Sequence, residues 1–591
     1  MYETRPWLKF YGYIPESLEY PHQTMYEMVR DAALAHPDLT AYDFMGTRST
    51  YRQLLADIDS MADALAGRGL AKGDAVTISL PNCPQAIILF YAINKIGAVG
   101  NMIHPLSAPT EIAFYLNESR SVWAATLDAF YGSFEKVLAG SSVRTLLLAR
   151  IGDYLSPTKR AGFYLLSGRK IARPPKGDAR VLWWKELAPG RPAIPAQTGA
   201  RGRAATPRVQ MPSGSGEPSE EQHVRATPPA PEDCAVILYS GGTTGTPKGI
   251  MLSSLNFNAL GLQIAAQGPL EPGDAILSIL PVFHGFGLGV CIHAFLIKGG
   301  RCVLVPRFTA ETVAKLIKKE HPQYMAGVPT LYEALLRDRT MKRTSLSCLK
   351  VVYAGGDKLP QSIKERFDAM IRERGGHAEL LEGYGLTESV TACIATPRNN
   401  FRPGSIGVPI SDMLAKVVMP GTLDEVEPEK DGELCVCGPT VMMGYLNSPE
   451  ITAQTLRRHD DGRIWLHTGD ICSMDRDGFV YFKLRAKRII KVSGVSVSPI
   501  QIEEVLDHHP DVSMSCVIGI PDPYKMQTLK AYVVLRDGKA ASPEKERELI
   551  EHCRSHLIKW SVPEKIEFRD SLPMTRIGKI AFSELEKEVG S

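Results

Sequence analysis

Long apolar runs are scarce in this sequence of 591 residues. The two most apolar stretches, near 86–104 and 285–298, are interrupted by Lys95 and by glycines and His293. Neither supplies the ~18 uncharged residues that a membrane-spanning helix needs. The N-terminus also lacks the apolar core of a secretory signal. These absences predict a cytoplasmic protein.

An excess of one charge and a disulfide framework are also missing. Lys and Arg number 68 against 65 Asp and Glu, a net +3 that is too even for a dedicated nucleic-acid-binding protein. The eleven cysteines are scattered and odd in number, which favours reduced thiols. Cys435 and Cys437 form the one close pair. No second pair or histidine stands at the usual zinc spacing from it, so we expect no metal site there.

What the sequence does contain is an α/β alternation in a chain long enough for several domains. A helix is expected from Thr24 to Pro37, since Thr24 and Glu27 have the spacing of a capping box. A strand is expected at Ala75–Leu80. The character changes near residue 485. We therefore expect a large α/β N-terminal domain, 1–484, and a small α+β C-terminal domain, 485–591.

A basic insertion at about 155–231 interrupts the predicted N-terminal domain. Between Lys159 and Arg208 twelve residues are Lys or Arg and two are Asp or Glu, and Pro, Gly, Ala and Ser prevail after Pro189. The simpler interpretation is a solvated surface segment, and no nucleic acid is expected because no recognition motif accompanies the charge. The alternative is peripheral contact with the inner face of the membrane, with five residues in the interface: Phe163, Tyr164, Leu166, Trp183 and Trp184.

The strongest local signal is a Gly/Thr-rich segment directly after an apolar strand, Tyr239-Ser-Gly-Gly-Thr-Thr-Gly-Thr-Pro-Lys-Gly-Ile250. Glycines let the backbone wrap around phosphate oxygens, hydroxyls add donors, and Lys248 adds a positive charge. The Gly-Lys-Ser/Thr ending of a Walker A loop is absent, which disfavours a P-loop NTPase. The predicted phosphate-binding residues are Ser240, Gly241, Gly242, Thr243, Thr244, Gly245, Thr246 and Lys248.

Several further segments follow this loop in a fixed order. They are Pro281-Val-Phe-His-Gly-Phe-Gly287, Val328-Pro-Thr-Leu-Tyr332, Ala354-Gly-Gly-Asp357, Glu382-Gly-Tyr-Gly-Leu-Thr-Glu-Ser389, Trp465-Leu-His-Thr-Gly-Asp470, the basic run 481–494 and Leu572-Pro-Met-Thr-Arg-Ile-Gly-Lys-Ile580. Taken singly, each has a plain explanation, such as a packed histidine, a strand-to-helix turn or a solvated basic face. Together they resemble the adenylate-forming superfamily of acyl- and aryl-CoA ligases, peptide-synthetase adenylation domains and beetle luciferases.

The resemblance implies a role for each matching position. ATP and AMP contacts are implied for the phosphate loop and for Gly355, Gly356, Asp357, Glu382, Gly383, Tyr384, Gly385, Thr387, Asp470, Arg485 and Lys579. The implied acid pocket consists of Phe283, His284, Gly285, Val328, Gly356, Tyr384 and Gly385. Mg²⁺, a hard ion that takes oxygen ligands, would be held by Thr244 and Glu388. The implied catalytic residues are Lys579, Glu388, Lys248 and His284.

The resemblance also implies a two-step mechanism on a jointed fold. A large domain of layered α/β subdomains with a small distorted β-barrel would carry a mobile lid that pivots near Lys487. Lys491, Ser493 and Gly494 would then line the CoA channel. Lys579 would offset charge while carboxylate and ATP form an acyl-adenylate, which the CoA thiol then attacks. Leu484 stands where the family usually has glycine, so the path of the linker is in question.

The acid is predicted from two segments. Residues 281–287 and 382–389 most resemble medium- and long-chain fatty acyl-CoA synthetases, so we expect a fatty acid, with ATP and CoA as co-substrates and Mg²⁺ as cofactor. An aryl-CoA ligase for a coumarate- or phenylacetate-like acid and an acyl-AMP ligase that loads a carrier protein remain alternatives, and both monomer and homodimer remain open. A non-catalytic acyl-binding protein is disfavoured because the key positions are all filled: Lys248, Glu388, Asp470, Arg485 and Lys579.

Overall fold

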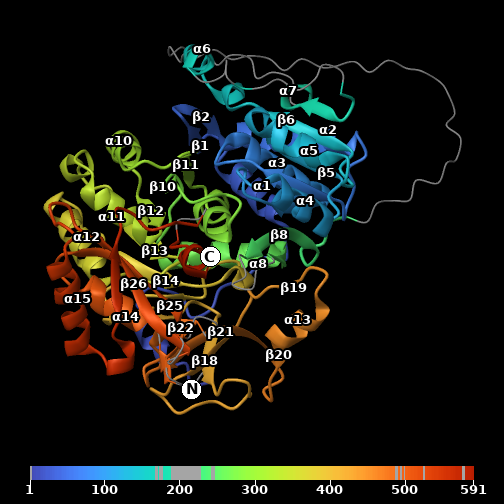
Figure 1. The fold of residues 1–591 in the computed structure, drawn as a ribbon. Helices are drawn as coiled ribbons and strands as arrows, with labels where there is room; N and C mark the ends of the chain where they lie inside the picture. Colours follow the sequence, from blue (N-terminus) through green and yellow to red (C-terminus); the bar gives the residue numbers. More distant parts are fainter. Residues whose placement is uncertain are drawn as a thin grey trace, which may run out of the picture.

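The computed structural model describes residues 3–166, 171, 178–187, 228–240, 247–485, 490–492, 495–497, 499–522, 526–575 and 579–590. Three sheets are built from residues up to 485, and a fourth from residues beyond it (Figure 1). Helices cover the sheets, so the predicted α/β class is confirmed.

The first large sheet has nine strands. Its central strands run parallel, and antiparallel pairs close both ends. In spatial order they are β16 (Val408–Pro409), β15 (Ile394–Ala395), β14 (Leu380–Tyr384), β13 (Val351–Gly355), β12 (Tyr324–Gly327), β10 (Ala275–Ser278), β11 (Arg301–Leu304), β1 (Thr40–Phe44) and β2 (Thr47–Thr50).

The second large sheet has eight strands and is built mostly from the N-terminal third of the chain. The hairpin of β8 and β9 enters it next to β4, and β19 pairs with β9 from a distant part of the chain. In spatial order the strands are β19 (Gly444–Tyr445), β9 (Lys248–Ser253), β8 (Cys234–Ser240), β4 (Val99–Met102), β3 (Ala75–Ser79), β5 (Trp123–Leu127), β6 (Thr145–Ala149) and β7 (Val181–Trp183).

Helices join the two large sheets into one core. Helix α3 is apolar all round, and every residue from Pro84 to Asn94 is buried. It packs against α2, while α8 contacts α1 and the π-helix η5 (Phe286–His293). The α-helices of this part are α1 (Met25–Ala35), α2 (Tyr51–Ala66), α3 (Pro84–Ile96), α4 (Pro109–Glu118), α5 (Tyr131–Leu138), α6 (Pro157–Leu166), α7 (Trp184–Leu187), α8 (Ser254–Gln267), α9 (Ala294–Leu296), α10 (Ala310–Glu320), α11 (Pro329–Arg337), α12 (Gln361–Glu373) and α13 (Pro449–Thr455). Short 3-10 turns are η1 (Pro6–Phe10), η2 (Asp128–Phe130), η3 (Ile151–Tyr154), η6 (Met341–Arg343), η7 (Thr387–Ser389) and, beyond residue 485, η9 (Lys559–Ser561).

The capping box predicted for the first helix is present. The Thr24 hydroxyl accepts from the Glu27 N–H at 3.2 Å, and the Thr24 N–H donates to the Glu27 carboxylate at 2.7 Å. These two bonds satisfy backbone donors that the helix itself leaves unpaired. Helix α1 therefore begins at Met25, as the spacing predicts.

The third sheet is an open, antiparallel, five-stranded half-barrel, in place of the small barrel implied by the resemblance. Its strands are β17 (Leu414–Val418), β18 (Gly432–Cys437), β21 (Ile464–Met474), β20 (Leu456–Arg458) and β22 (Val480–Arg485). The fourth sheet, with helices α14 (Pro499–Asp507), α15 (Pro543–His556) and α16 (Phe582–Gly590), contains β24 (Val495–Val497), β23 (Ile490–Val492), β26 (Met526–Leu535), β25 (Val512–Asp522) and β27 (Lys565–Phe568).

The described part of the basic insertion packs on the protein. Trp184 is 2% exposed and belongs to the main core, so its predicted place in a membrane interface is wrong. Phe163 packs against the same core, and the Arg150 guanidinium lies 3.9 Å from the centre of the Trp183 ring. The side chains of Tyr164 and Leu166 lie outside the described residues. Among the described residues, no helix is both long and apolar enough to cross a bilayer.

Candidate active site

A cavity of about 70 Å³ lies where the first sheet, η5 and the C-terminal residues meet. Its lining includes the polar side chains of His284, Tyr384, Thr387 and Lys579. The rest of its wall is mainly apolar and small. These further lining residues are Ile264, Gln267, Phe286, Val290, Tyr353, Ala354, Gly355, Gly356, Gly383, Gly385, Leu386, Thr391, Ala392, Ile394, Ala395 and Ile410.

Lys579 reaches the cavity from the C-terminal part of the chain. It stands next to Ile580, which pairs with Met574 in an isolated bridge, and its carbonyl accepts from the Thr575 N–H at 2.6 Å. Its N–H donates to the Thr575 hydroxyl at 3.0 Å. A Cβ added at Gly356 would lie 3.6 Å from Lys579 Cε and 3.5 Å from Val328, so both side chains lie beside this glycine. The structure therefore places Lys579, Gly356 and Val328 together.

His284 is neutral in this arrangement. Its Nδ1 accepts from the Phe286 N–H at 3.1 Å, which leaves the proton on Nε2. Burial, reinforced by the positive charge of Lys579, lowers its pKa to about 4. A neutral imidazole beside an ammonium can donate one hydrogen bond to a carboxylate without adding charge.

Tyr384 and Asp470 form a pair across two sheets. The Tyr384 hydroxyl donates to Asp470 Oδ2 at 2.7 Å, and Asp470 is 2% exposed. Burial and the charge of Asp470 raise the pKa of Tyr384 well above its usual value. Strand β21 positions Asp470, whose backbone pairs with Arg485 on β22. The Arg485 side chain lies outside the described residues.

Tyr445 is a site residue that the sequence reasoning missed. Its hydroxyl donates to Glu388 Oε1 at 2.8 Å, and the Lys248 ammonium lies 4.9 Å from the centre of its ring. It arrives on β19, which pairs with Ile250 and Met251 of β9. A Gly-Tyr pair almost 200 residues after the phosphate loop carries no spacing signal, so only the strand pairing reveals it.

The predicted phosphate loop is the connection between β8 and β9. Ser240 and Lys248 pair at the ends of the two strands, and the predicted loop is the segment of the chain between them. Gly241, Gly242, Thr243, Thr244, Gly245 and Thr246 themselves lie outside the described residues, as do Lys487, Ser493 and Gly494. Lys491 lies on β23, and its side chain is likewise not described.

Glu382 is a buried carboxyl at the back of the site. Its Oε1 accepts from the Leu359 N–H at 3.0 Å, and burial raises its pKa to about 7. Asp357 is exposed, and its Oδ1 accepts from the Lys358 N–H at 2.9 Å. Glu382 thus fixes the loop after β13 rather than opening into the cavity lined by its neighbour Gly383.

Two residues predicted for the acid pocket, Phe283 and Gly285, are not among the residues that line the cavity. The Phe283 ring packs on His104 at 4.5 Å, and Phe286 takes the place on the cavity surface. At Gly285 an added Cβ would lie 1.8 Å from the Val390 carbonyl oxygen. Glycine is therefore required there for the two segments to approach.

Polar contacts hold the C-terminal part against the first sheet. Lys358 pairs with Glu504 of α14, and Arg337 donates to the Ser513 hydroxyl of β25. Ser513 in turn lies 3.4 Å from Glu333, a buried carboxylate that also pairs with Arg337 at 2.9 Å. Figure 1 shows α14 and β25 beside α11 and α12. These contacts accompany the inserted position of Lys579.

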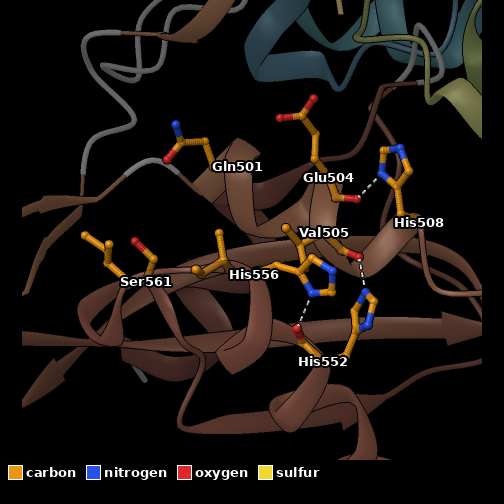
Figure 2. A pocket seen from close by; sticks show the side chains of 9 residues that line it. Gln501, Glu504, Val505, His508, His552, His556 and Ser561 are labelled. Carbon is orange, nitrogen blue, oxygen red and sulfur yellow. Dashed lines mark hydrogen bonds between the residues drawn. The ribbon is translucent and has the colours of Figure 1, made fainter. Parts of the chain in front are cut away.

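A second cavity lies on the C-terminal part, between α14 and α15 (Figure 2). His508, His552 and His556 line it, and each donates one ring N–H to a backbone carbonyl, at 2.6, 3.0 and 2.8 Å. None of its lining residues is shared with the first cavity. Of these three bonds, the one from His552 to the Val505 carbonyl joins the two helices.

The comparisons agree with this geometry. Models of the AMP-binding enzyme family and of its C-terminal domain match residues 29–446 and 501–579. A long-chain-fatty-acid–CoA ligase of Bacillus subtilis (strain 168) is 33% identical over 596 residues, which cover 100% of this chain and 99% of the relative.

Two solved structures share the fold. The anthranilate CoA ligase AuaEII in complex with anthranoyl-AMP has a TM-score of 0.78 at 23% identity, over 97% of this chain and 98% of that one. A benzoate CoA ligase from Burkholderia xenovorans LB400 has a TM-score of 0.77 at 21% identity, over 95% and 100%. The chain therefore belongs to the AMP-binding enzyme family, as an acid–thiol ligase.

Proposed function

We propose that this protein is an ATP-dependent fatty acyl-CoA ligase that activates a medium- or long-chain acid as its acyl-adenylate and transfers the acyl group to CoA. One observation carries the proposal. Lys579 and neutral His284 line one cavity whose remaining wall is mainly apolar. An ammonium and a hydrogen-bond donor beside an apolar wall suit a carboxylate that carries an apolar chain.

The nucleotide would lie across the Tyr384–Asp470 pair. The Tyr384 ring and the glycines around it offer a flat, open surface for adenine, and the buried Asp470 carboxylate offers acceptors for ribose hydroxyls. Lys248 and residues 241–246 would hold the terminal phosphates. We propose that Gly355, Gly383 and Thr387, for which the resemblance implies ATP and AMP contacts, contribute to the same surface.

The residues present fit Mg²⁺. Glu388 supplies carboxylate oxygens, Tyr445 orients one of them, and the Lys248 ammonium lies over the ring of the same tyrosine. Oxygen donors of this kind are what Mg²⁺ prefers. When bound with Thr244 and Glu388, the ion would neutralise charge on the pyrophosphate leaving group.

In the first step the acid carboxylate attacks the α-phosphate, and pyrophosphate leaves. Lys579 would contact both reacting groups and offset the negative charge that builds up between them. In the second step the CoA thiol attacks the acyl carbon, its proton is lost, and AMP leaves. Lys579 must withdraw first, which we propose happens by rotation of 485–591 about the hinge near Lys487.

The acid class rests on two supports. The curated relative that covers the whole chain is named for long-chain fatty acids. The anthranilate and benzoate CoA ligases share the fold of this protein at only 21–23% identity to it. The cavity wall also includes Ile264, Val290 and Ile410, which offer apolar contacts to an aliphatic chain. For the basic insertion, the packing of Trp183 and Trp184 on the protein supports the solvated interpretation.

The test is AMP release from Mg·ATP over a panel of acids, from short and long fatty acids to phenylacetate and coumarate, with and without CoA. We expect CoA-dependent turnover that peaks on fatty acids. A peak on aromatic acids would overturn the substrate, and an adenylate that CoA fails to discharge would indicate a carrier-protein acceptor.

A matched variant tests the role of Lys579. Lys579→Ala should lower adenylate formation by about 100-fold or more while thioester formation from preformed acyl-AMP continues. Equal loss of both half-reactions would contradict the role of Lys579. Lys587→Ala, on the same terminal segment, is the control.

A further inference from the structure

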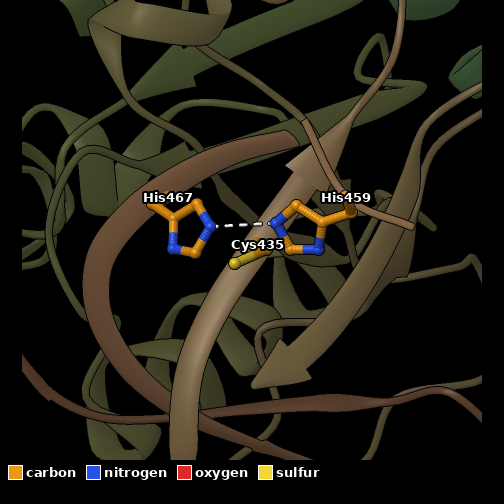
Figure 3. Close-up of side chains that lie close together, drawn as sticks. All are labelled: Cys435, His459 and His467. Atoms are coloured by element: carbon orange, nitrogen blue, oxygen red, sulfur yellow. Dashed lines mark hydrogen bonds between the residues drawn. The ribbon is translucent and has the colours of Figure 1, made fainter. Parts of the chain in front are cut away.

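Beneath the turn that carries Asp470, three side chains with metal-binding atoms meet. They are Cys435 of β18, His459 in the turn after β20, and His467 of β21 (Figure 3). Their ligand atoms all lie within 4.8 Å of one another. Relative exposures are 0%, 4% and 6%, so the cluster is buried.

Strand register assembles the cluster. Cys435 and His467 are directly opposite on the antiparallel pair of β18 and β21, which puts both side chains on one face of the sheet. The hairpin of β20 and β21 turns back through a His459–Arg463 hydrogen bond at 3.0 Å and delivers His459 to the same face. The sequence spacing from Cys435 is 24 and 32 residues, which no zinc motif shares and which hid the cluster from the sequence analysis.

We propose that Cys435, His459 and His467 form a binding site for a thiophilic divalent transition ion, with Zn²⁺ as the expected occupant. The site is separate from the one proposed for Mg²⁺. One thiolate and two imidazoles favour Zn²⁺ over the hard ions Mg²⁺ and Ca²⁺, which take oxygen ligands. Three protein ligands leave the fourth tetrahedral position for water.

The histidine tautomers suit a metal. His467 Nδ1 donates to Glu433 Oε2 at 2.9 Å, so the Nε2 of a neutral His467 presents its lone pair. That Nε2 lies 3.0 Å from Nε2 of His459. A carboxylate behind a ligating histidine is the usual outer partner in zinc sites, because it orients the ring and raises its basicity. Without a metal, a single proton between the two nitrogens takes the ion's place.

The local charges balance for a divalent ion. Zn²⁺, the Cys435 thiolate and the Glu433 carboxylate sum to zero, which a buried site favours. The nearby Lys416 lies 4.4 Å from the centre of the Trp465 ring and 3.7 Å from Glu425. The Cys435 thiol gives up its proton when it binds the ion.

The site connects to the nucleotide turn. Glu433 accepts from the His467 ring and, through its other oxygen, from the Gly469 N–H at 3.0 Å. Gly469 directly precedes Asp470, the residue that pairs with Tyr384. An ion on His467 would therefore hold the Thr468–Asp470 turn in place, and we expect it to raise the thermal midpoint by a few degrees.

The test uses the full chain, reduced and treated with chelator, and titrated with Co²⁺ as the spectroscopic probe. We expect one equivalent to produce a thiolate-to-cobalt charge-transfer band and visible bands of tetrahedral intensity, and Zn²⁺ to abolish both. Absence of the charge-transfer band in the wild-type chain would overturn the proposal.

Matched variants assign the ligands. Cys435→Ser should remove the charge-transfer band. His459→Gln should weaken metal binding by about 100-fold, because loss of a ligand costs at least as much affinity as loss of a residue that only orients a ligand. Cys437→Ser, two residues along the same strand, should bind as the wild type does. A band that persists in Cys435→Ser, or that Cys437→Ser also loses, would overturn the assignment.

X-ray absorption on the zinc-loaded wild-type chain gives a readout that needs no variant to fold. We expect one sulfur at about 2.3 Å and nitrogen or oxygen at about 2.0 Å. A zinc coordination shell without sulfur would exclude Cys435 as a ligand and overturn the proposed site. Because none of these measurements uses turnover, they are independent of the proposed ligase activity.

Discussion

At the scale of single residues, the site depends on polar side chains that orient other polar side chains. Tyr445 carries no reacting group, yet it joins Lys248 and Glu388 through its ring and its hydroxyl. Its position is 7% exposed, so its hydroxyl has few alternative partners. Such outer contacts set how precisely a carboxylate is presented to a metal ion.

We expect Tyr445→Phe to raise the Mg²⁺ concentration needed for half-maximal adenylate formation by about 10-fold, because Glu388 loses the donor that orients it. Adenylation rates measured across a Mg²⁺ titration check this. Tyr481→Phe, which loses a hydroxyl bonded to Asp475 instead, is the control. An unchanged Mg²⁺ dependence would show that Tyr445 is only part of the core.

A second residue makes stability depend on pH. Burial raises the pKa of Glu382 to about 7 from an ordinary 4.5, so the folded protein binds a proton there that the unfolded chain releases. Protonated Glu382 contributes its full stabilisation of the folded state below pH 4.5, the pKa of this group in the unfolded chain. That contribution is lost as pH rises through about 7, its pKa in the folded protein.

Glu382→Gln keeps the acceptor for Leu359 and removes the ionisation. We expect the variant to gain stability relative to the wild type as pH rises from about 4.5 to 7, by up to about 3 kcal/mol, and then to hold that gain. Thermal midpoints measured in parallel over this range check it. A difference that does not vary with pH would show that the Glu382 pKa is the same in the folded and the unfolded state.

At the scale of elements, two irregular segments lock together to form the wall of the cavity. Val390 has φ 61° and ψ −53°, and the Thr391 N–H donates to the Ser389 carbonyl at 2.7 Å, which makes a γ-turn. A fully buried valine in this strained conformation is held by its surroundings. The turn presses its carbonyl against Gly285, just before the π-helix η5.

Gly285→Ala should therefore disturb both segments, since the new Cβ would lie 1.8 Å from the Val390 oxygen. We expect a loss of about 1–3 kcal/mol in stability and a rise in KM for the acid. Gly132→Ala in α5, where an added Cβ meets nothing within 4 Å, is the control. Wild-type KM and melting in Gly285→Ala would contradict the close approach.

At the scale of the whole molecule, the structure shows the position in which Lys579 reaches the cavity. The polar contacts of Lys358 with Glu504 and of Arg337 with Ser513 belong to this position. The rotation that we propose for residues 485–591 would break them. They would then bias the protein toward adenylation, each by a small amount because the pairs are partly exposed.

Glu504→Gln removes one of these pairs. We expect adenylate formation to slow by about 3-fold while thioester formation from preformed acyl-AMP stays equal or quickens. Single-turnover rates of both half-reactions check this. Glu551→Gln, which loses a pair with Arg554 within α15, is the control. Equal slowing of both steps would show that the pair does not discriminate between the two positions.

The sequence by itself determined the α/β class, the start of α1 directly after its cap Thr24, and the order of the segments that carry Lys248, His284, Asp470 and Lys579. These depend on local hydrogen bonds, periodicity and short motifs, which a linear pattern records. The tertiary structure decided which side chains meet. Tyr445 reaches Glu388, Tyr384 reaches Asp470, and Cys435 reaches His459 and His467 only through strand pairing between distant segments. Register across a sheet is set by the packing of whole elements, and no spacing in the chain encodes it.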